Sequence, residues 1–381
     1  MEEIKNLKEA ADRIKEAVKN KEKIIIYGDS DLDGVTSVII ANEAIKNLGG
    51  KIQALYFPNR ENEGYGISEM GLDFLKKFSP ALLVVFDCGI SNFKEVKTAK
   101  KLGLEVIIVD HHEILDKLPD VKIIIDPKQK DDKYPFKQFA ACGLAFLLAV
   151  ALLGKKMTEN LRKDLIELAA LGTIADMMPR EDDNKIFILE GLRSLENSWR
   201  PGIKIFLDSL GDSLRLDQKV QKLISILNAR DVEDNLPASF RLLTLSSEDE
   251  TKKLLEKLIE KSEEKKDRTE TVLGQAEGRL LGKKEKIIFE GEKDWDYSLI
   301  SIVASILVNR HQKPTFIFKK GDKESQGTVR MPKNTNAVLL MKTCQKLLLT
   351  YGGHPMAAGF RIKNENLAEF KKCLIKNYNG R

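Results

Sequence analysis

Three aspartates on alternate residues stand immediately before a glycine near the start of the chain. They are Asp29, Asp31 and Asp33, and Gly34 follows them. Carboxylates this close together repel one another unless a cation neutralises them, and their hard oxygen atoms suit Mg²⁺ or Mn²⁺. A solvated turn capped by an aspartate is the alternative. A calcium loop is disfavoured, because no glutamate stands at its twelfth position and no helix is expected before it.

The elements around these aspartates place them at the end of a strand. Residues 23–27 form a short apolar, β-branched run that is typical of a buried parallel strand, and residues 35–41 continue with helical spacing. Further apolar runs alternate with helical stretches, which predicts a parallel sheet covered on both faces. These further runs are residues 52–57, 82–86, 104–109 and 123–125.

The residues after the third and fourth predicted strands complete a candidate site. Asp87 directly follows the third strand, and Asp110, His111 and His112 directly follow the fourth. Because the carboxyl ends of parallel strands meet at one edge of a sheet, we expect these side chains to lie close to the first three aspartates. A single aspartate often caps a helix, but ligand-type residues at three strand ends favour a metal site.

A further aspartate is embedded in an apolar helical stretch. Asp176 follows residues 165–173, and a buried carboxylate there needs a partner. Convergence on the same metal ions would supply one. The collected oxygen-rich set with one or two imidazoles is similar to a two-metal hydrolytic site.

Composition limits the class of protein. The chain has 381 residues, of which 42% are hydrophobic and 32% charged, as is typical of a soluble globular protein of two domains. No apolar run approaches the ~18 residues of a membrane span, so no membrane association is expected. The four cysteines are too scattered for a disulfide framework or a zinc motif, which predicts a reduced, cytoplasmic setting. The net charge of +5 permits a polyanionic partner without requiring one.

The motifs, in their order along the chain, resemble those of the DHH-family phosphoesterases and, within that family, the RecJ-like single-strand nucleases. The segments that carry the resemblance to the four family motifs are DSDLDG, FDCGIS, DHH and GTIADMMP. RENEGYGIS and FAACGLAFLLAVAL resemble segments of RecJ-like nucleases, and GGHPMAAGF resembles the glycine-rich DHH-associated domain.

The resemblance implies an α/β fold in three parts. A parallel-sheet DHH catalytic domain with a helical appendage is expected at residues 1–245. A connecting helix, favoured also by the dense Glu and Lys content, is expected at residues 246–283. A smaller α/β DHH-associated domain is expected at residues 284–381, with a cleft between the two domains. No room is left after it for a further oligonucleotide-binding domain, which favours a compact, archaeal-type homologue.

The resemblance also implies individual roles around two divalent ions, with Mn²⁺ favoured over Mg²⁺. The implied metal ligands are Asp29, Asp31, Asp33, Asp87, His111 and Asp176. Asp87 would bridge the two ions. His112 would face the substrate and either stabilise the phosphate or protonate the leaving oxygen, while Asp110 would orient a neighbouring histidine.

Substrate contacts are expected from both domains. The residues are Arg60, Tyr65, Thr328, Arg330, Gly353 and His354. The Tyr65 ring could stack on a base, and Arg330 could bind a phosphate bidentately. Glycine lets the backbone approach a ligand closely, so that His354 could donate to a phosphate oxygen.

These features favour a metal-dependent exonuclease of single-stranded DNA or RNA with a role in DNA repair or replication. One alternative is a phosphodiesterase of short oligonucleotides or dinucleotides. Another is a scaffold associated with the replisome or a helicase that keeps residual nuclease activity. The intact ligand set argues against a pure scaffold, which has no need of repelling carboxylates. A replisome or repair-helicase protein is an expected partner besides the nucleic acid.

Overall fold

The computed structural model describes residues 3–60, 62–114, 117–229, 231–282 and 285–378. The chain divides into two compact units, Met1–Glu260 and Lys261–Arg381. This division falls within a long helix, α11 (Glu248–Leu280), which covers most of the stretch predicted to connect two domains. The predicted boundary at residues 283 and 284 lies outside the described residues.

The first unit is built on a sheet of five parallel strands in the order β2–β1–β3–β4–β5. The strands are β1 (Ile24–Gly28), β2 (Ile52–Tyr56), β3 (Ala81–Phe86), β4 (Leu104–Val109) and β5 (Ile123–Ile125). Each lies within one residue of its predicted range. The predicted parallel α/β sheet is therefore confirmed.

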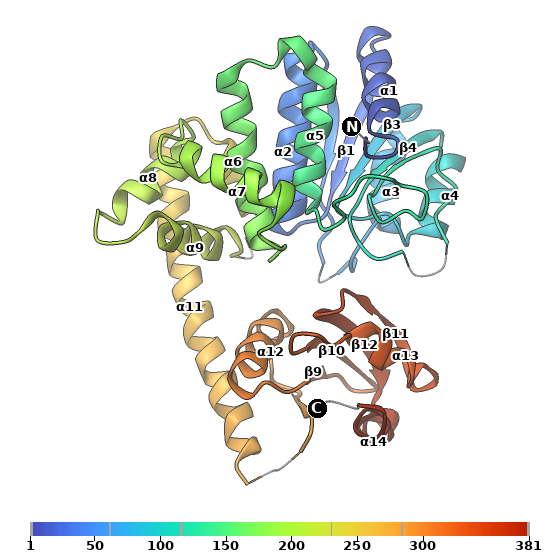
Figure 1. The fold of residues 1–381 in the computed structure, drawn as a ribbon, viewed down its shortest axis with the longest axis vertical. Helices are drawn as coiled ribbons and strands as arrows, with labels where there is room; N and C mark the ends of the chain where they lie inside the picture. Colours follow the sequence, from blue (N-terminus) through green and yellow to red (C-terminus); the bar gives the residue numbers. More distant parts are fainter. Residues whose placement is uncertain (1–2, 61, 115–116, 230, 283–284, 379–381) are drawn as a thin grey trace. The chain divides into compact units, whose positions relative to one another are not determined.

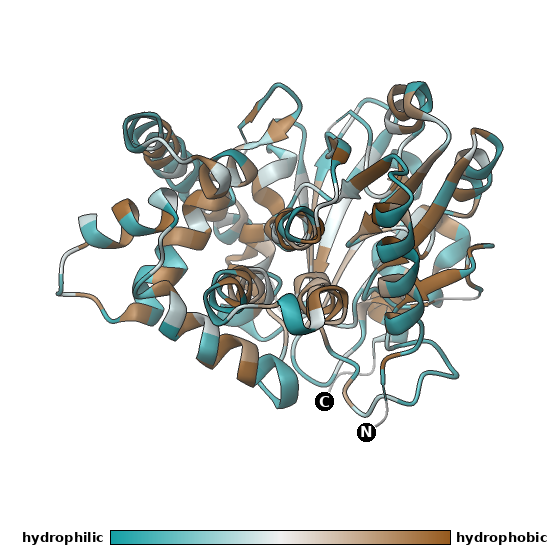
Figure 2. Ribbon diagram, turned by 90° about the horizontal axis from the view of Figure 1, so that it is seen from above, coloured by the Kyte–Doolittle hydropathy of each residue, from teal (hydrophilic) through white to brown (hydrophobic). Residues whose placement is uncertain are grey.

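Alternate residues of each strand enter two different cores, as the period of a strand requires. Ile24 and Ile26 face a core shared with α1 (Leu7–Lys19), α2 (Leu32–Asn47) and α5 (Ala141–Leu153), whereas Ile25 and Tyr27 face a core shared with α3 (Glu69–Leu75) and α4 (Phe93–Lys101). Helices α2 and α5 lie side by side in Figure 1 and pack together along their length. Figure 2 shows the apolar strands in brown, with teal on the outer sides of the helices.

Further helices extend the first core. They are α6 (Glu159–Ala175), α7 (Asp182–Leu195), α8 (Pro201–Ser209), α9 (Leu216–Leu227) and α10 (Ala238–Thr244), and the short strands β6 (Val232–Glu233) and β7 (Leu236–Pro237) form a hairpin before α10. This region corresponds to the predicted helical appendage.

The second unit has a five-stranded sheet of its own in the order β11–β12–β10–β9–β8. The strands are β8 (Ile288–Glu292), β9 (Thr315–Lys320), β10 (Glu324–Arg330), β11 (Leu348–Gly353) and β12 (Ala357–Lys363), and only the β8–β9 pair among them is parallel. Helix α12 (Tyr297–His311) and the last turns of α11 share one core with this sheet. Helices α13 (Ala337–Lys342) and α14 (Leu367–Asn377) share the other. The predicted smaller α/β domain is confirmed.

A disulfide joins Cys344, just after α13, to Cys373 in α14. The four cysteines were predicted to be too scattered for a disulfide framework, but one pair does form, because the packing of α13 against α14 brings together two residues 29 positions apart. Cys88 and Cys142 are buried free thiols of the first unit. The cysteines therefore no longer support the predicted reducing compartment. A cytoplasmic location stays a prediction. None of the described helices is both long and apolar enough to cross a bilayer.

Candidate metal centre

The strand register brings three of the predicted residues to the same edge of the first sheet. The backbone N–H of Asp29 donates to the last residue of β3, that of Asp87 to the last residue of β4, and that of Asp110 to the last residue of β5, at 3.2, 2.9 and 3.0 Å. Each aspartate therefore directly follows its own strand and lies beside the end of the neighbouring strand in the sheet. This is the carboxyl edge at which open α/β sheets bind ligands.

The turn between β1 and α2 fixes the first aspartates. Asp31 caps α2 by accepting a hydrogen bond from the backbone N–H of Gly34 at 3.1 Å, and Asp33 lies buried in the first turn. A Cβ atom at Gly34 would lie 2.4 Å from the backbone oxygen of Asp29. Only glycine permits this turn to fold so tightly against its own carboxylates.

The N-terminus of α5 holds the carboxylate of Asp33. The backbone N–H groups of Ala141 and Cys142 donate to its two oxygens, each at 2.8 Å. The capping residue of α5 is Ala140, whose side chain cannot cap, so Asp33 satisfies helix donors that the local sequence leaves open. These backbone donors were not predicted from the sequence. The available signal was an apolar helix that begins without a polar capping residue.

One imidazole nitrogen lies among three of the predicted carboxylates. Nε2 of His111 is 3.2 Å from Oδ1 of Asp87 and 3.6 Å from Oδ2 of Asp33 and of Asp176. The side chains of His111, Asp33 and Asp87 are at most 3% exposed. Asp87 has φ +60°, a left-handed conformation that aspartate tolerates better than most residues. Asp33, Asp87 and His111 are placed to hold one cation.

Asp29, Asp31 and Asp87 form a second group of converging ligand atoms. The guanidinium of Arg60 lies against this group, with Nε donating to Oδ1 of Asp29 at 2.9 Å and Nη2 to Oδ2 of Asp31 at 2.8 Å. The residue predicted to contact substrate therefore pairs here with two predicted metal ligands. Its positive charge offsets the repulsion between them.

His112 lies beside His111 but has different partners. Its Nδ1 is 2.7 Å from Oδ1 of Asp110, which also accepts from the backbone N–H of both histidines. The hydroxyl of Tyr65 donates to the backbone oxygen of Asp87 at 2.9 Å and lies 3.2 Å from Nε2 of His112. Tyr65, whose ring is predicted to stack on a base, is 51% exposed.

Burial and crowding shift the acidities of these groups. Burial and the neighbouring Asp31 carboxylate raise the pKa of Asp33 to about 6. Burial, followed by Asp31 and Asp33, raises the pKa of Asp87 well above its ordinary value. Burial opposes ionisation of Asp110 as well, but the attraction and hydrogen bond of His112 hold its pKa below the ordinary value. Each shift is of the kind found at functional sites.

A bound divalent cation fits this chemistry. Oδ1 of Asp87 and Oδ2 of Asp176 are buried, and neither makes a hydrogen bond within the described part of the chain. Buried carboxylate oxygens without partners are costly unless a cation or a proton compensates them. The combination of carboxylates with one imidazole suits Mn²⁺ and Mg²⁺.

Two further residues at this edge were not predicted as part of a site. Asp126 follows β5, is fully buried, and has its pKa raised to about 8 by burial and by Asp110. Lys128 donates from Nζ to the backbone oxygen of His111 at 2.6 Å. The signal for Asp126 was the one used for the other strands, namely an aspartate directly after a strand.

The predicted substrate residues of the second unit lie at one end of its own sheet. Arg330 is the last residue of β10 and donates to the hydroxyls of Ser305 at 3.1 Å and Thr328 at 2.9 Å. Gly353, with φ +129°, ends β11 and leads into a tight turn in which the N–H of His354 donates to the oxygen of Ala357 at 2.7 Å. Burial lowers the pKa of Arg330.

Two family models match the chain. Residues 23–173 match the DHH family, N-terminal domain, and residues 283–379 match the DHHA1 domain. The single-stranded-DNA-specific exonuclease RecJ of Bacillus subtilis is 35% identical over 379 residues, covering 98% of this chain and 48% of the relative. RecJ of Escherichia coli is 28% identical, covering 97% of this chain and 69% of the relative. The chain thus spans about half the length of the Bacillus protein.

Solved structures with the same fold include metal-bound relatives. An exonuclease RecJ bound to manganese has a TM-score of 0.79 and 27% identity, covering 98% of this chain and 94% of that chain. RecJ of Thermus thermophilus in complex with Mn²⁺ has a TM-score of 0.82 and 27% identity, covering 98% of this chain and 54% of that chain. The likeness extends over both units of the chain.

Proposed function

Because this chain belongs to the DHH family and resembles RecJ along nearly its whole length, we propose that it is a metal-dependent exonuclease of single-stranded DNA. The observation that carries the proposal is that two candidate cation groups at one sheet edge share Asp87. A shared carboxylate holds two ions close together, which is the arrangement that phosphodiester hydrolysis uses in two-metal enzymes.

The residues present fit two divalent ions, Mn²⁺ or Mg²⁺. Asp33, Asp87 and His111 would hold one, and Asp29, Asp31 and Asp87 the other. Asp176 lies next to the first group, with its Oδ2 atom 3.6 Å from Nε2 of His111. When bound, such ions would stabilise the charge on the phosphate and supply a nucleophilic water at neutral pH.

His112 is the protein group best suited to act on the substrate itself. Its side chain is 23% exposed, whereas that of His111 is 1% exposed, so His112 can be reached by a substrate at the centre. The Asp110 carboxylate, 2.7 Å from Nδ1, fixes the orientation of the ring. We assign His112 the role of donating a proton or a hydrogen bond to the phosphodiester oxygen that leaves.

Arg330 and His354 are proposed to bind a phosphate of the strand. Both lie at the same end of the second sheet, and the Gly353 turn lets backbone approach a ligand closely. Thr328 orients the Arg330 guanidinium. A cleft between the catalytic and DHH-associated domains, as well as a role in repair or replication, stays a prediction.

The test is a time course with end-labelled strands about thirty nucleotides long. Single-stranded DNA, matched RNA, duplex DNA and a dinucleotide are each incubated with Mn²⁺, Mg²⁺ or a chelator. We expect mononucleotides from single-stranded DNA with either metal and none with the chelator. Cleavage confined to the dinucleotide would instead support a short-oligonucleotide phosphodiesterase, and metal binding without cleavage of any substrate would support a scaffold.

A further inference from the structure

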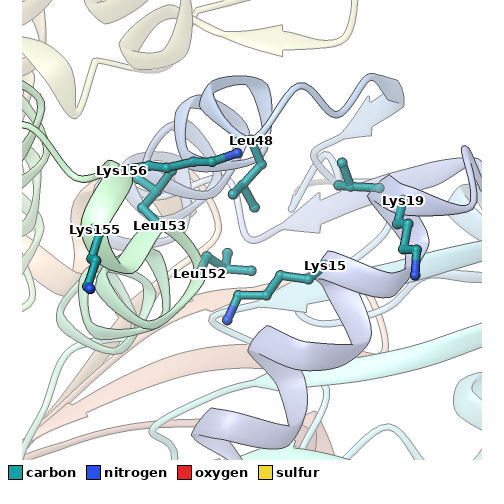
Figure 3. Close-up of a pocket in the computed structure, with 8 residues that line it drawn as sticks. Lys15, Lys19, Leu48, Leu152, Leu153, Lys155 and Lys156 are labelled. Carbon is teal, nitrogen blue, oxygen red and sulfur yellow. The ribbon is translucent and has the colours of Figure 1, made fainter.

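A second cluster of charge lies at the opposite end of the helices that hold the acidic centre. A cavity of about 390 Å³ is lined by the ends of α1, α2 and α5 and by the turn after α5. Its lining residues are Lys15, Val18, Lys19, Leu48, Leu152, Leu153, Lys155 and Lys156. Figure 3 shows the leucine side chains between the lysines. We call this cavity the lysine pocket.

The floor of the lysine pocket is apolar and its rim is cationic. Leu152 and Leu153 are buried, whereas Lys19, Lys155 and Lys156 are exposed. Among the residues that the structure describes, no aromatic or arginine side chain lines it. A groove for single-stranded nucleic acid combines positive charge with aromatic rings on which bases stack, so the lining favours a different kind of ligand.

Three of the four rim lysines have no ion-pair partner in the described part of the chain. Lys15 lies 3.4 Å from the exposed carboxylate of Asp12, while Lys19, Lys155 and Lys156 form no ion pair with a described residue. Lysines near helix C-termini offset the helix dipoles, and three helix ends carry roughly −0.5 elementary charges each. An anionic partner would therefore meet three lysines that have no ion-pair partner among the described residues.

The lysine pocket is separate from the acidic centre. Asp31 caps the start of α2, and Leu48 caps its end. The 16 residues of this helix span about 24 Å. A ligand in the pocket does not touch the carboxylates at the other end.

We propose that the lysine pocket binds an acidic peptide segment of a partner protein, in which carboxylates flank a large apolar side chain. The apolar side chain enters the leucine-lined floor, which gains from the removal of apolar surface from water. The flanking carboxylates meet the rim lysines, which gives attraction that falls with added salt. The volume lies in the range of roughly 300–1,000 Å³ that specific ligand sites occupy.

The probe is a fluorescein-labelled peptide of eight residues, with six aspartates around one phenylalanine and one leucine. Its binding is measured by fluorescence anisotropy. A matched peptide replaces both apolar residues by serine, and labelled oligo-dT of ten nucleotides reports on nucleic acid. The test variant is Lys155→Glu with Lys156→Glu, and the control is Lys97→Glu with Lys101→Glu on exposed positions of α4. All proteins are full-length, and circular dichroism confirms that each is folded.

We expect the wild type and the α4 control to bind the acidic apolar peptide alike, and the test variant to bind at least tenfold more weakly. We expect the serine peptide to bind weakly to every protein, and cleavage of single-stranded DNA to be the same in the test variant as in the wild type. Equal binding of the peptide by wild type and test variant, or no binding by either, would overturn the proposal. So would oligo-dT binding that depends on Lys155 and Lys156, since the pocket would then serve nucleic acid. If the paired test variant does not fold, Lys15→Glu with Lys19→Glu is judged by the same outcomes.

Discussion

At the N-terminal ends of α2 and α5, carboxylates gather with too few cations. Beside the C-terminal ends of the same helices, four lysines from α1 and from the turn after α5 gather, and three of them have no ion pair with a described residue. Both arrangements follow the helix dipole, which favours negative groups at the start of a helix and positive groups at its end. They differ in burial. The side chains of Asp33 and Asp87 are at most 3% exposed, while three of the four lysines are exposed.

This difference in burial decides what each end can bind. A buried charge cannot be compensated by water, so the acidic end requires a cation or a retained proton. An exposed lysine keeps its hydration, so the basic end gains only a modest amount from each contact, and salt weakens that gain. We therefore expect substitutions of the buried acidic residues to change activity, metal affinity and stability strongly. Substitutions of the exposed residues around them should have smaller effects.

The largest effect should come from Asp87, which both cation groups share. Asp87→Asn should lower the turnover of single-stranded DNA at saturating Mn²⁺ by at least a hundredfold, about 2.7 kcal/mol. The metal-free variant should melt at or above the wild-type temperature, because one member of a repelling cluster is lost and asparagine tolerates the left-handed backbone. Retention of more than about a tenth of turnover, under ~1.4 kcal/mol, would contradict the shared role.

The two adjacent histidines should separate binding from chemistry. His111→Ala should weaken Mn²⁺ binding, and raised Mn²⁺ should restore part of its activity. His112→Ala should bind Mn²⁺ normally and lose roughly 10²–10³ in kcat, since it acts on the substrate. Calorimetric Mn²⁺ titration of both variants measures the difference. An equal loss of metal affinity would show that His112 is a ligand as well.

The acidic end should also govern the pH dependence of metal-free stability. The folded pKa of Asp33, about 6, lies above its ordinary 3.8, so the folded state holds more protons between these values. The free energy of unfolding should therefore fall by about 2 kcal/mol through Asp33 as pH rises from 4 to 6. Urea unfolding of wild type and Asp33→Asn in chelator measures this, and the variant should show a flatter profile. Saturating Mn²⁺ should restore stability above pH 6.

The smallest effect at this end should come from Arg60, which is 37% exposed and compensates Asp29 and Asp31 from outside. A second cation must displace its guanidinium from those carboxylates. Arg60→Ala should therefore bind the second Mn²⁺ roughly two- to tenfold more tightly, a gain limited by solvent screening. Mn²⁺ titration monitored by electron paramagnetic resonance tests this, with the exposed Arg215→Ala as control. If the variant binds the second Mn²⁺ no more tightly than the wild type, the Arg60 guanidinium does not compete with the cation for Asp29 and Asp31.

The sequence predicted the sheet and the residues at its edge for the same reason. A buried parallel strand is a short apolar run, and an aspartate or histidine directly after it has nowhere else to lie than the carboxyl edge. Hydrogen bonds across the sheet then carry Asp29, Asp87 and Asp110 to neighbouring positions. Asp126 obeys the same rule and could have been added.

Contacts between segments that are distant in the sequence could not be predicted from the sequence. The N–H groups of Ala141 and Cys142 carry no side-chain signature, so their bonds to Asp33 could be found only once α5 was placed against α2. The lysine pocket gathers residues from three helices whose ends are far apart in sequence. The pairing of Cys344 with Cys373 likewise depends on how two helices of the second unit pack.

That disulfide has a consequence for how the second unit withstands proteases. Cys344 and Cys373 enclose β11, β12 and the turn containing Gly353 and His354 in a covalent loop. A protease that cuts the chain anywhere inside this loop leaves both pieces linked. The nicked protein should therefore migrate as a single full-length band on a denaturing gel, and release α14 with its C-terminal segment only after a reductant is added.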